Sequence, residues 1–196
     1  MEKKLPSDFT YEKYGVQFRF VNENDAAFIV KLRTDPRLSR FIHDTDNDID
    51  KQKAWIRKYK EREAAGTEYY FAVSIDNKTQ GFIRIYSIHD KTFTVGSIIM
   101  NKEAPIHCVL AATIMAKEIA FEILDFELED SYDGVHVDNK QVVKLNRSWG
   151  KEEYRRFPDV KGEYIAFRLT KEDYLQVKPK KVRQLHLVMG DTNKNE

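Results

Sequence analysis

Cysteine is almost absent from this sequence. Cys108 is the one cysteine among 196 residues, so neither a disulfide framework nor a cysteine-rich zinc site can form within one chain. Apolar runs are also short. None approaches the roughly 18 residues of a membrane-spanning helix, and the first residues lack the apolar core of a signal peptide. These absences lead us to expect a cytoplasmic protein that does not bind a membrane.

An excess of charge of one sign is lacking as well. The formal net charge is +1, so the overall field does not favour nucleic acid. Four aspartates occur in residues 37–50, but this stretch lacks the glycine and the final glutamate of an EF-hand calcium loop. We therefore expect no nucleic-acid partner and no metal site.

The composition is otherwise that of a folded domain. Hydrophobic residues make up 41% and charged residues 33%, which is typical of a globular protein with a sizeable core. The 12 phenylalanines and 10 tyrosines favour a dense core. No repeat or low-complexity linker divides the chain. We expect an N-terminal arm at residues 1–14, a single domain at residues 15–185 and a flexible tail at residues 186–196.

Hydrophobic periodicity predicts an alternation of strands and helices. Alternating or continuous apolar residues predict strands, and apolar residues three or four apart predict helices. The expected strands are residues 16–21, 69–75, 81–88, 92–100, 128–136 and 164–169. The expected helices are residues 26–34, 49–65, a central helix ending near 124, 139–148, and a C-terminal helix from 171 to about 184.

Residues 92–124 organise the chain. They read as a strand, a short loop containing Pro105, and the central helix. The first N–H groups of a helix have no intrahelical partner and the helix dipole favours negative charge there, so this unit can bind an anion. An ordinary strand-to-helix connection is the alternative that the residues alone leave open.

The order of these elements resembles that of the GNAT (Gcn5-related N-acetyltransferase) superfamily. Local phrases share the resemblance: residues 18–29 (FRFVNENDAAFI), 32–36 (LRTDP), 81–85 (GFIRI), 120–121 (AF), 139–142 (NKQV), Gly150 and 164–173 (YIAFRLTKED). The last phrase is similar to the ribosomal-protein and nucleotide-sugar acetyltransferase branches. The resemblance covers residues 16–174. It implies an α/β (α+β) fold whose mixed, mostly antiparallel twisted sheet of about six to seven strands is flanked by helices.

The same resemblance implies acetyl-CoA as co-substrate and a set of residues that would hold it. The backbone of the fourth strand would bind the pantetheine arm, and the start of the central helix would bind the pyrophosphate. Asn139 matches an asparagine that contacts pantetheine in the family, although capping the following helix is an alternative role. The implied cofactor-binding residues are Ile98, Ile99, Met100, Ile106, His107, Cys108, Val109, Leu110, Ala111 and Asn139.

The loop before the central helix departs from the family pattern. The family's loop is glycine-rich because backbone N–H groups must approach phosphate closely. Residues 103–112 (EAPIHCVLAA) contain no glycine, arginine or glutamine. They are similar to a proline-led loop in GNAT-like proteins from bacterial surface-polysaccharide gene clusters. Either the helix start still presents its N–H groups to the cofactor, or cofactor binding has been lost.

Candidate catalytic residues follow from the needs of amine acetylation. A base must take the amine proton, and His136 is the first candidate, before Glu68 and His107. Asn146 stands where relatives carry a tyrosine that protonates the leaving thiolate. It can donate a hydrogen bond but no proton at neutral pH. Cys108 is expected to pack rather than to act as a nucleophile, because no thiolate-stabilising base accompanies it.

Substrate binding is expected near the loop after the first helix. The candidate residues are Arg33, His43, Arg84 and Tyr86; surface solvation and packing on the sheet are the alternatives for them. We expect a small-molecule amine as substrate, such as an amino sugar on a nucleotide carrier, by analogy alone. The competing hypothesis is a catalytically silent GNAT-like domain that binds a ligand or partner. A homodimer is left open.

Overall fold

The computed structural model describes residues 3–42 and 45–190. Its strands are β1 (Thr10–Lys13), β2 (Val16–Phe20), β3 (Tyr69–Ile75), β4 (Lys78–His89), β5 (Thr92–Met100), β6 (Leu128–Asp130), β7 (Val135–His136), β8 (Glu152–Asp159) and β9 (Gly162–Thr170). Its helices are η1 (Glu23–Asp25), α1 (Ala26–Arg33), α2 (Pro36–Ser39), α3 (Ile49–Ala65), α4 (Ile106–Glu118), η2 (Ile119–Ile123), α5 (Lys140–Ser148) and α6 (Lys171–Met189). None of the helices in this part of the chain has both the length and the apolar character needed to cross a membrane.

One mixed sheet connects all the strands. Its order is β1-β2-β3-β4-β5-β6-β9-β7, and β8 pairs with β9 as well. All neighbours are antiparallel except β5 and β6. The predicted α/β fold with a mostly antiparallel sheet is therefore confirmed, with nine strands rather than six to seven. The strand predicted at residues 128–136 is interrupted into β6 and β7, and β8 was not predicted because its sequence EEYRRFPD is polar.

Both ends of the predicted domain need correction. Residues 10–13 of the predicted arm form β1, which pairs with β2 from Thr10–Arg19 to Lys13–Val16. Tyr14 and Gly15 make the tight turn with φ angles of 57° and 68°. At the other end, α6 continues to Met189, so the tail predicted from residue 186 begins inside a helix.

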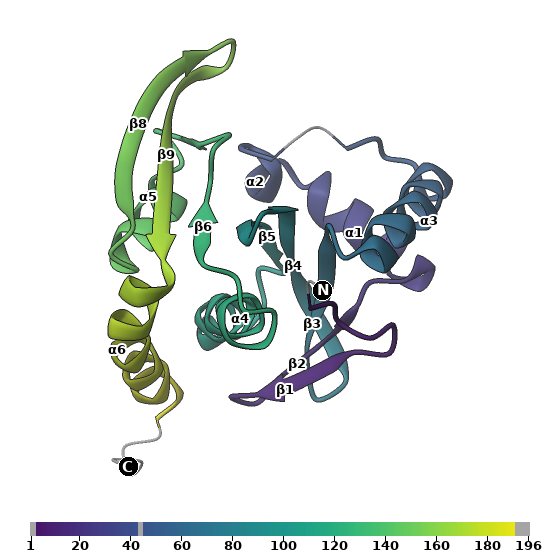
Figure 1. The fold of residues 1–196 in the computed structure, drawn as a ribbon. Coiled ribbons are helices and arrows are strands. Elements are labelled where there is room, and N and C mark those ends of the chain that lie inside the picture. Colours follow the sequence, from purple (N-terminus) through teal and green to yellow (C-terminus); the bar gives the residue numbers. More distant parts are fainter. Residues whose placement is uncertain (1–2, 43–44, 191–196) are drawn as a thin grey trace.

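Helices cover the two faces of the sheet (Figure 1). On one face, α4 packs against β2–β5 around residues such as Phe71, Ile83 and Met115, and α6 packs beside α4. On the other face, α1 and α3 pack around residues such as Tyr70 and Phe82. Alternate residues of β3 and β4 thus belong to different cores, as the period of a strand requires. The β8–β9 ribbon extends away from the rest of the sheet (Figure 1).

A buried group of three charges lies where β6 joins the sheet. Glu129 is completely buried and pairs with Phe93 of β5 and Leu169 of β9. Its carboxylate forms ion pairs with Lys117 of α4, at 3.1 Å, and with Lys151 just before β8. Both lysine side chains are 3% exposed. Because an isolated buried charge is very costly, each member of this triad needs the others.

The triad predicts a specific pH dependence of stability. Burial, reinforced by the nearby Lys151 charge, lowers the pKa of Lys117 from 10.5 to about 8 despite the attraction of Glu129. Between these two pH values the unfolded chain binds a proton that the folded chain does not. The free energy of unfolding therefore gains a contribution that rises with pH in this window and is absent below it.

We expect the variant Lys117→Met to lack this rise. The stability difference, wild type minus variant, should increase by about 3 kcal/mol between pH 8 and pH 10.5. Urea unfolding across this range measures it, and tyrosines that titrate at higher pH cancel in the difference. Lys144→Met, at an exposed site on α5, is the matched control and should give a flat difference. A flat or falling difference for Lys117→Met would contradict the assignment.

Candidate active site

The site begins where β5 and β6 separate. These parallel strands pair only at Thr92–Leu128 and Phe93–Glu129. β6 then continues beside β9, with Asp130 opposite Arg168, while β5 stays with β4 as far as Met100. Within the described residues, the β5 edge beyond Phe93 thus has no strand partner. Unpaired strand edges offer a row of N–H and C=O groups to an extended ligand.

A β-bulge changes the direction of β5 along this open edge. The register with β4 shifts between the Phe82–Ile99 and Arg84–Gly96 pairs, and Ser97 has a φ of 49°. A Cβ atom at Gly96 would lie 2.9 Å from the Tyr86 hydroxyl, so a larger residue here would require the tyrosine to move. Bulges commonly direct backbone groups at functional sites.

The predicted cofactor-binding residues of β5 follow this bulge. The Ile99 side chain is buried on the α1/α3 face, and Ile98 and Met100 pack partly on the α4 face. Their side chains are thus occupied in the two cores. Their backbone at the open edge is what they can offer a ligand.

The start of α4 lies directly after β5 in the chain. Pro105 precedes the helix, and the Cys108 N–H donates back to the Pro105 carbonyl at 2.9 Å. The N–H groups of Ile106 and His107 come too early in the helix to have an intrahelical acceptor. The Ile106 side chain is 84% exposed, so it points to solvent. The missing glycine therefore does not prevent this helix from offering its N–H groups to an anion.

The remaining predicted loop residues anchor α4. Cys108 and Ala111 are fully buried, and Leu110 packs partly against the same core. Val109 is half-buried. Burial raises the pKa of the Cys108 thiol to about 11, so the thiol stays protonated at neutral pH. This agrees with the predicted packing role.

His136 is engaged at both ring nitrogens. Its Nε2 lies 2.9 Å from the Lys161 carbonyl, which can only accept, and its Nδ1 lies 3.1 Å from the Asp138 N–H, which can only donate. These partners define a neutral ring with the proton on Nε2. The ring also contacts Phe41 at 5.3 Å. This geometry gives His136 a structural task in holding the β8–β9 turn, and its role as a base stays a prediction.

The residues predicted on α5 are close to the sheet. Asn139 caps α5, accepting a hydrogen bond from the Val142 N–H at 3.4 Å, which is the alternative role considered for it. Asn146 faces inward and is 8% exposed. The roles predicted for both in cofactor chemistry stay predictions.

Two of the predicted substrate residues, Arg33 and Arg84, line one cavity of 590 Å³ on the α1/α3 side, which we call the arginine pocket. His43 lies outside the described residues. Tyr86 adjoins the pocket, because its ring lies 5.1 Å from the Arg84 guanidinium. The lining residues are Ile29, Arg33, Thr45, Asp46, Asp48, Lys51, Gln52, Trp55, Arg62, Glu68, Tyr70 and Arg84.

Glu68 holds the inner end of the arginine pocket together. Its nearly buried carboxylate accepts from the Arg84 Nε at 2.9 Å and from the Arg62 Nε at 2.7 Å. Both guanidinium groups lie 5.4 Å from the Trp55 ring. Arg84 also reaches the β5 bulge, with its Nη1 3.5 Å from the Ser97 hydroxyl. Arg84 therefore connects the pocket to the β5 bulge.

Sequence reasoning missed most of this inner end. The sequence places Trp55 and Arg62 only within the predicted helix 49–65, and Tyr70 only within the predicted strand 69–75. Glu68 is predicted as a base candidate. The clue that the sequence does hold is the β3–β4 hairpin, because Tyr70 pairs directly with Arg84 across it.

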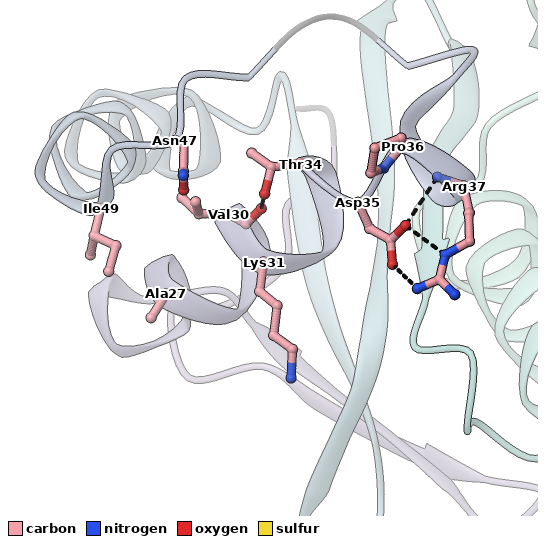
Figure 2. A pocket seen from close by; sticks show the side chains of 9 residues that line it. All are labelled: Ala27, Val30, Lys31, Thr34, Asp35, Pro36, Arg37, Asn47 and Ile49. Carbon is pink, nitrogen blue, oxygen red and sulfur yellow. Dashed lines mark hydrogen bonds and ion pairs between the residues drawn. The ribbon is translucent and has the colours of Figure 1, made fainter.

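A second hollow lies elsewhere on α1 (Figure 2). It has a volume of 580 Å³, and its lining includes Lys31, Asp35, Arg37 and Ile49. Hydrogen bonds from Arg37 lower the pKa of the exposed Asp35 to about 2. This hollow shares no lining residue with the arginine pocket and none with β5. It is therefore not part of the candidate site.

Comparisons with known proteins agree with this geometry. The profile of the acetyltransferase (GNAT) domain family matches residues 16–151. A solved structure described as apo FdhC, a nucleotide-linked sugar GNAT, has a TM-score of 0.76 and 29% identity, covering 91% of this chain and 99% of its own. A search of curated protein sequences gave no match.

Two other solved structures share the fold at lower identity. A ribosomal-protein-S5-alanine acetyltransferase from Vibrio fischeri has a TM-score of 0.72 and 15% identity, over 85% of this chain and 99% of its own. A SpeG spermidine N-acetyltransferase from Vibrio cholerae has a TM-score of 0.68 and 17% identity, over 83% and 98% respectively.

The start of α4 can be tested with one added charge. We expect Ile106→Glu to raise the Kd of acetyl-CoA about fivefold, because the carboxylate would repel phosphate at the helix start. The same carboxylate interacts favourably with the helix dipole, so the melting temperature without ligand should not fall. Val160→Glu, at a 97% exposed site in the β8–β9 turn, is the control. Calorimetric titration measures the affinity, and unchanged binding by Ile106→Glu would contradict a phosphate site here.

Proposed function

The chain belongs to the acetyltransferase (GNAT) domain family and is an N-acetyltransferase, and we propose that it transfers an acetyl group from acetyl-CoA to the primary amine of a small acceptor. We propose further that the acceptor is an amino sugar on a nucleotide carrier. The observation that carries the proposal is the unpaired β5 edge, which runs from the separation of β5 and β6 toward the start of α4 and adjoins the arginine pocket.

The donor would be held mainly by backbone groups. The open edge of β5 at residues 98–100 would pair with the extended pantetheine arm as an added strand does. The free N–H groups of Ile106 and His107, with the dipole of α4, would bind the pyrophosphate. Ala104 and Pro105 keep the approach to these groups clear of long side chains. A glycine-free loop is thus compatible with cofactor binding.

Transfer needs the oxyanion and the thiolate to be stabilised. An N–H of the unpaired β5 edge would donate to the oxyanion as it forms. The amide of Asn146 would donate a hydrogen bond to the leaving thiolate, which then collects its proton from solvent. Because both nitrogens of His136 are engaged and Glu68 is bound by two arginines, water is the proton acceptor that best fits this site.

The acceptor class is supported by the relative described as a nucleotide-linked sugar GNAT, the most similar of the three reported above. The arginine pocket supports it as well, because its size of 590 Å³ suits a small molecule. The GNAT structures described for a ribosomal protein and for spermidine are similar in fold alone.

The first experiment is thermal unfolding with excess acetyl-CoA, with free CoA as comparison. A ligand at about 100 times its Kd adds roughly 2.7 kcal/mol to the stability, which raises the melting temperature by several degrees. Release of free thiol is then measured with a panel of primary amines. No shift with millimolar ligand would overturn the proposed donor and favour a catalytically silent domain.

Asn146 can be tested separately from binding. We expect Asn146→Ala to lower kcat about tenfold, because the thiolate loses one hydrogen bond to a charged group, while the Kd of acetyl-CoA stays the same. Gln141→Ala, at an exposed site on the same helix, should leave both unchanged. An equal loss in kcat and in acetyl-CoA affinity would assign Asn146 to cofactor binding instead.

A further inference from the structure

The hydroxyl proton of Tyr70 lacks a hydrogen-bond acceptor. Tyr70 is 2% exposed and lines the arginine pocket. Its hydroxyl oxygen is buried and makes no hydrogen bond of ordinary geometry within the described residues; the nearby Arg33 guanidinium can only donate to it. Nearly all buried polar groups in proteins are hydrogen-bonded, and an orphan costs stability. A buried hydroxyl that lines a cavity and has no acceptor indicates a ligand that supplies the missing acceptor.

The charged neighbours of this hydroxyl decide what the ligand can be. Burial raises the pKa of Tyr70 to about 12, while the charges of Arg33 and Arg84 act in the opposite direction. A guanidinium can donate hydrogen bonds but cannot accept them. Neither arginine can therefore accept the Tyr70 O–H proton. The missing partner has to be a hydrogen-bond acceptor that tolerates two neighbouring cations.

The charge balance of the pocket also favours an anion at its inner end. Glu68 brings one negative charge but is shared by Arg62 and Arg84. The other two carboxylates are engaged at the rim, where Asp46 pairs with Lys51 at 2.9 Å and Asp48 caps α3. Among the described residues of the inner end, the two guanidinium groups of Arg62 and Arg84 thus share a single carboxylate, which leaves an excess of positive charge there.

We infer that the arginine pocket binds an anionic oxygen group of the acceptor, a phosphate or a carboxylate, with Tyr70 donating a hydrogen bond to it beside Arg84. This inference rests on the proposed function, whose acceptor it defines more narrowly. Arg84 also contacts Ser97 on the β5 bulge, so the anion lies next to the open edge where the amine must react. The acceptor accordingly carries its amine and its anionic group close together in one small molecule.

The inference separates this protein from enzymes whose acceptors carry only amines. A polyamine would bring positive charge to a pocket whose inner end already has an excess of it. We expect spermidine to be a poor acceptor here. The negative charge that balances the pocket is present in an amino sugar phosphate, a nucleotide-linked amino sugar or an amino acid.

The test compares Tyr70→Phe with Tyr132→Phe, a tyrosine that is 63% exposed. Acceptor kinetics are measured at saturating acetyl-CoA with glucosamine, glucosamine 6-phosphate, a nucleotide-linked amino sugar, glycine and spermidine. In the wild type we expect kcat/KM for at least one anionic acceptor to exceed that for glucosamine about tenfold or more. The acceptor that is preferred shows whether the pocket binds a phosphate or a carboxylate.

The variant supplies the decisive difference. Tyr70→Phe should raise KM for the anionic acceptors about tenfold, with kcat and the KM of acetyl-CoA little changed. Its KM for glucosamine should stay as in the wild type. Because the O–H proton has no acceptor without ligand, the melting temperature of the unliganded variant should change little. A lower melting temperature with an equal change for all acceptors would show a structural role and overturn the inference.

A binding experiment keeps this test separate from the proposed function. Inorganic phosphate and acetate are tested for protection against heat at saturating CoA, so that the start of α4 is already occupied. Protection of the wild type that is lost in Tyr70→Phe supports an anion pocket even if no amine is acetylated, which would refute only the proposed acceptor chemistry. Active enzyme with no preference for anionic acceptors would refute the inference and leave the proposed function standing.

Discussion

The ion pairs of Glu129 are the interaction on which the rest of the structure depends. This carboxylate has no solvent exposure and sits at the last pair between β5 and β6. Lys117 attaches it to α4, and Lys151 attaches it to the start of β8. Three charges this deeply buried are tolerated only with all partners in place. The point where the two strands separate, and hence the open edge of β5, is therefore set by one buried carboxylate.

The two proposed substrate regions lie on different sides of the sheet. α4 and its N-terminal N–H groups belong to the core on one face, while the arginine pocket belongs to the α1/α3 face. The bulge at Ser97 is the place where these two regions meet, because Arg84 reaches its hydroxyl from the pocket. An amine held on one face can thus approach a thioester held along the edge between them, which is the positioning that direct transfer requires.

The long periodic elements could be predicted from the sequence. The polar strands at the sheet edges and the register between strands could not. Helix α3 was predicted with its observed bounds, Ile49–Ala65. The strands β1 and β8 were missed because they are polar and lie outside the main core. Most of the inner end of the arginine pocket was missed for a subtler reason. A bulge between Val73 and Ser74 shifts the β3–β4 register by one residue. Without that shift Tyr70 would oppose Ile83, and a one-residue slip reverses the face of every side chain.

The inner end of the pocket is ordered before any ligand arrives. Arg62 and Arg84 are fixed on both sides of Trp55 by a nearly buried carboxylate, whereas the Lys51–Asp46 pair at the rim has side chains 66% and 68% exposed. Exposed pairs contribute little and order little. Guanidinium groups that are already immobile lose less conformational entropy when they bind an anion. With both ring nitrogens of His136 engaged, the function proposed above relies on such positioning rather than on a dedicated base.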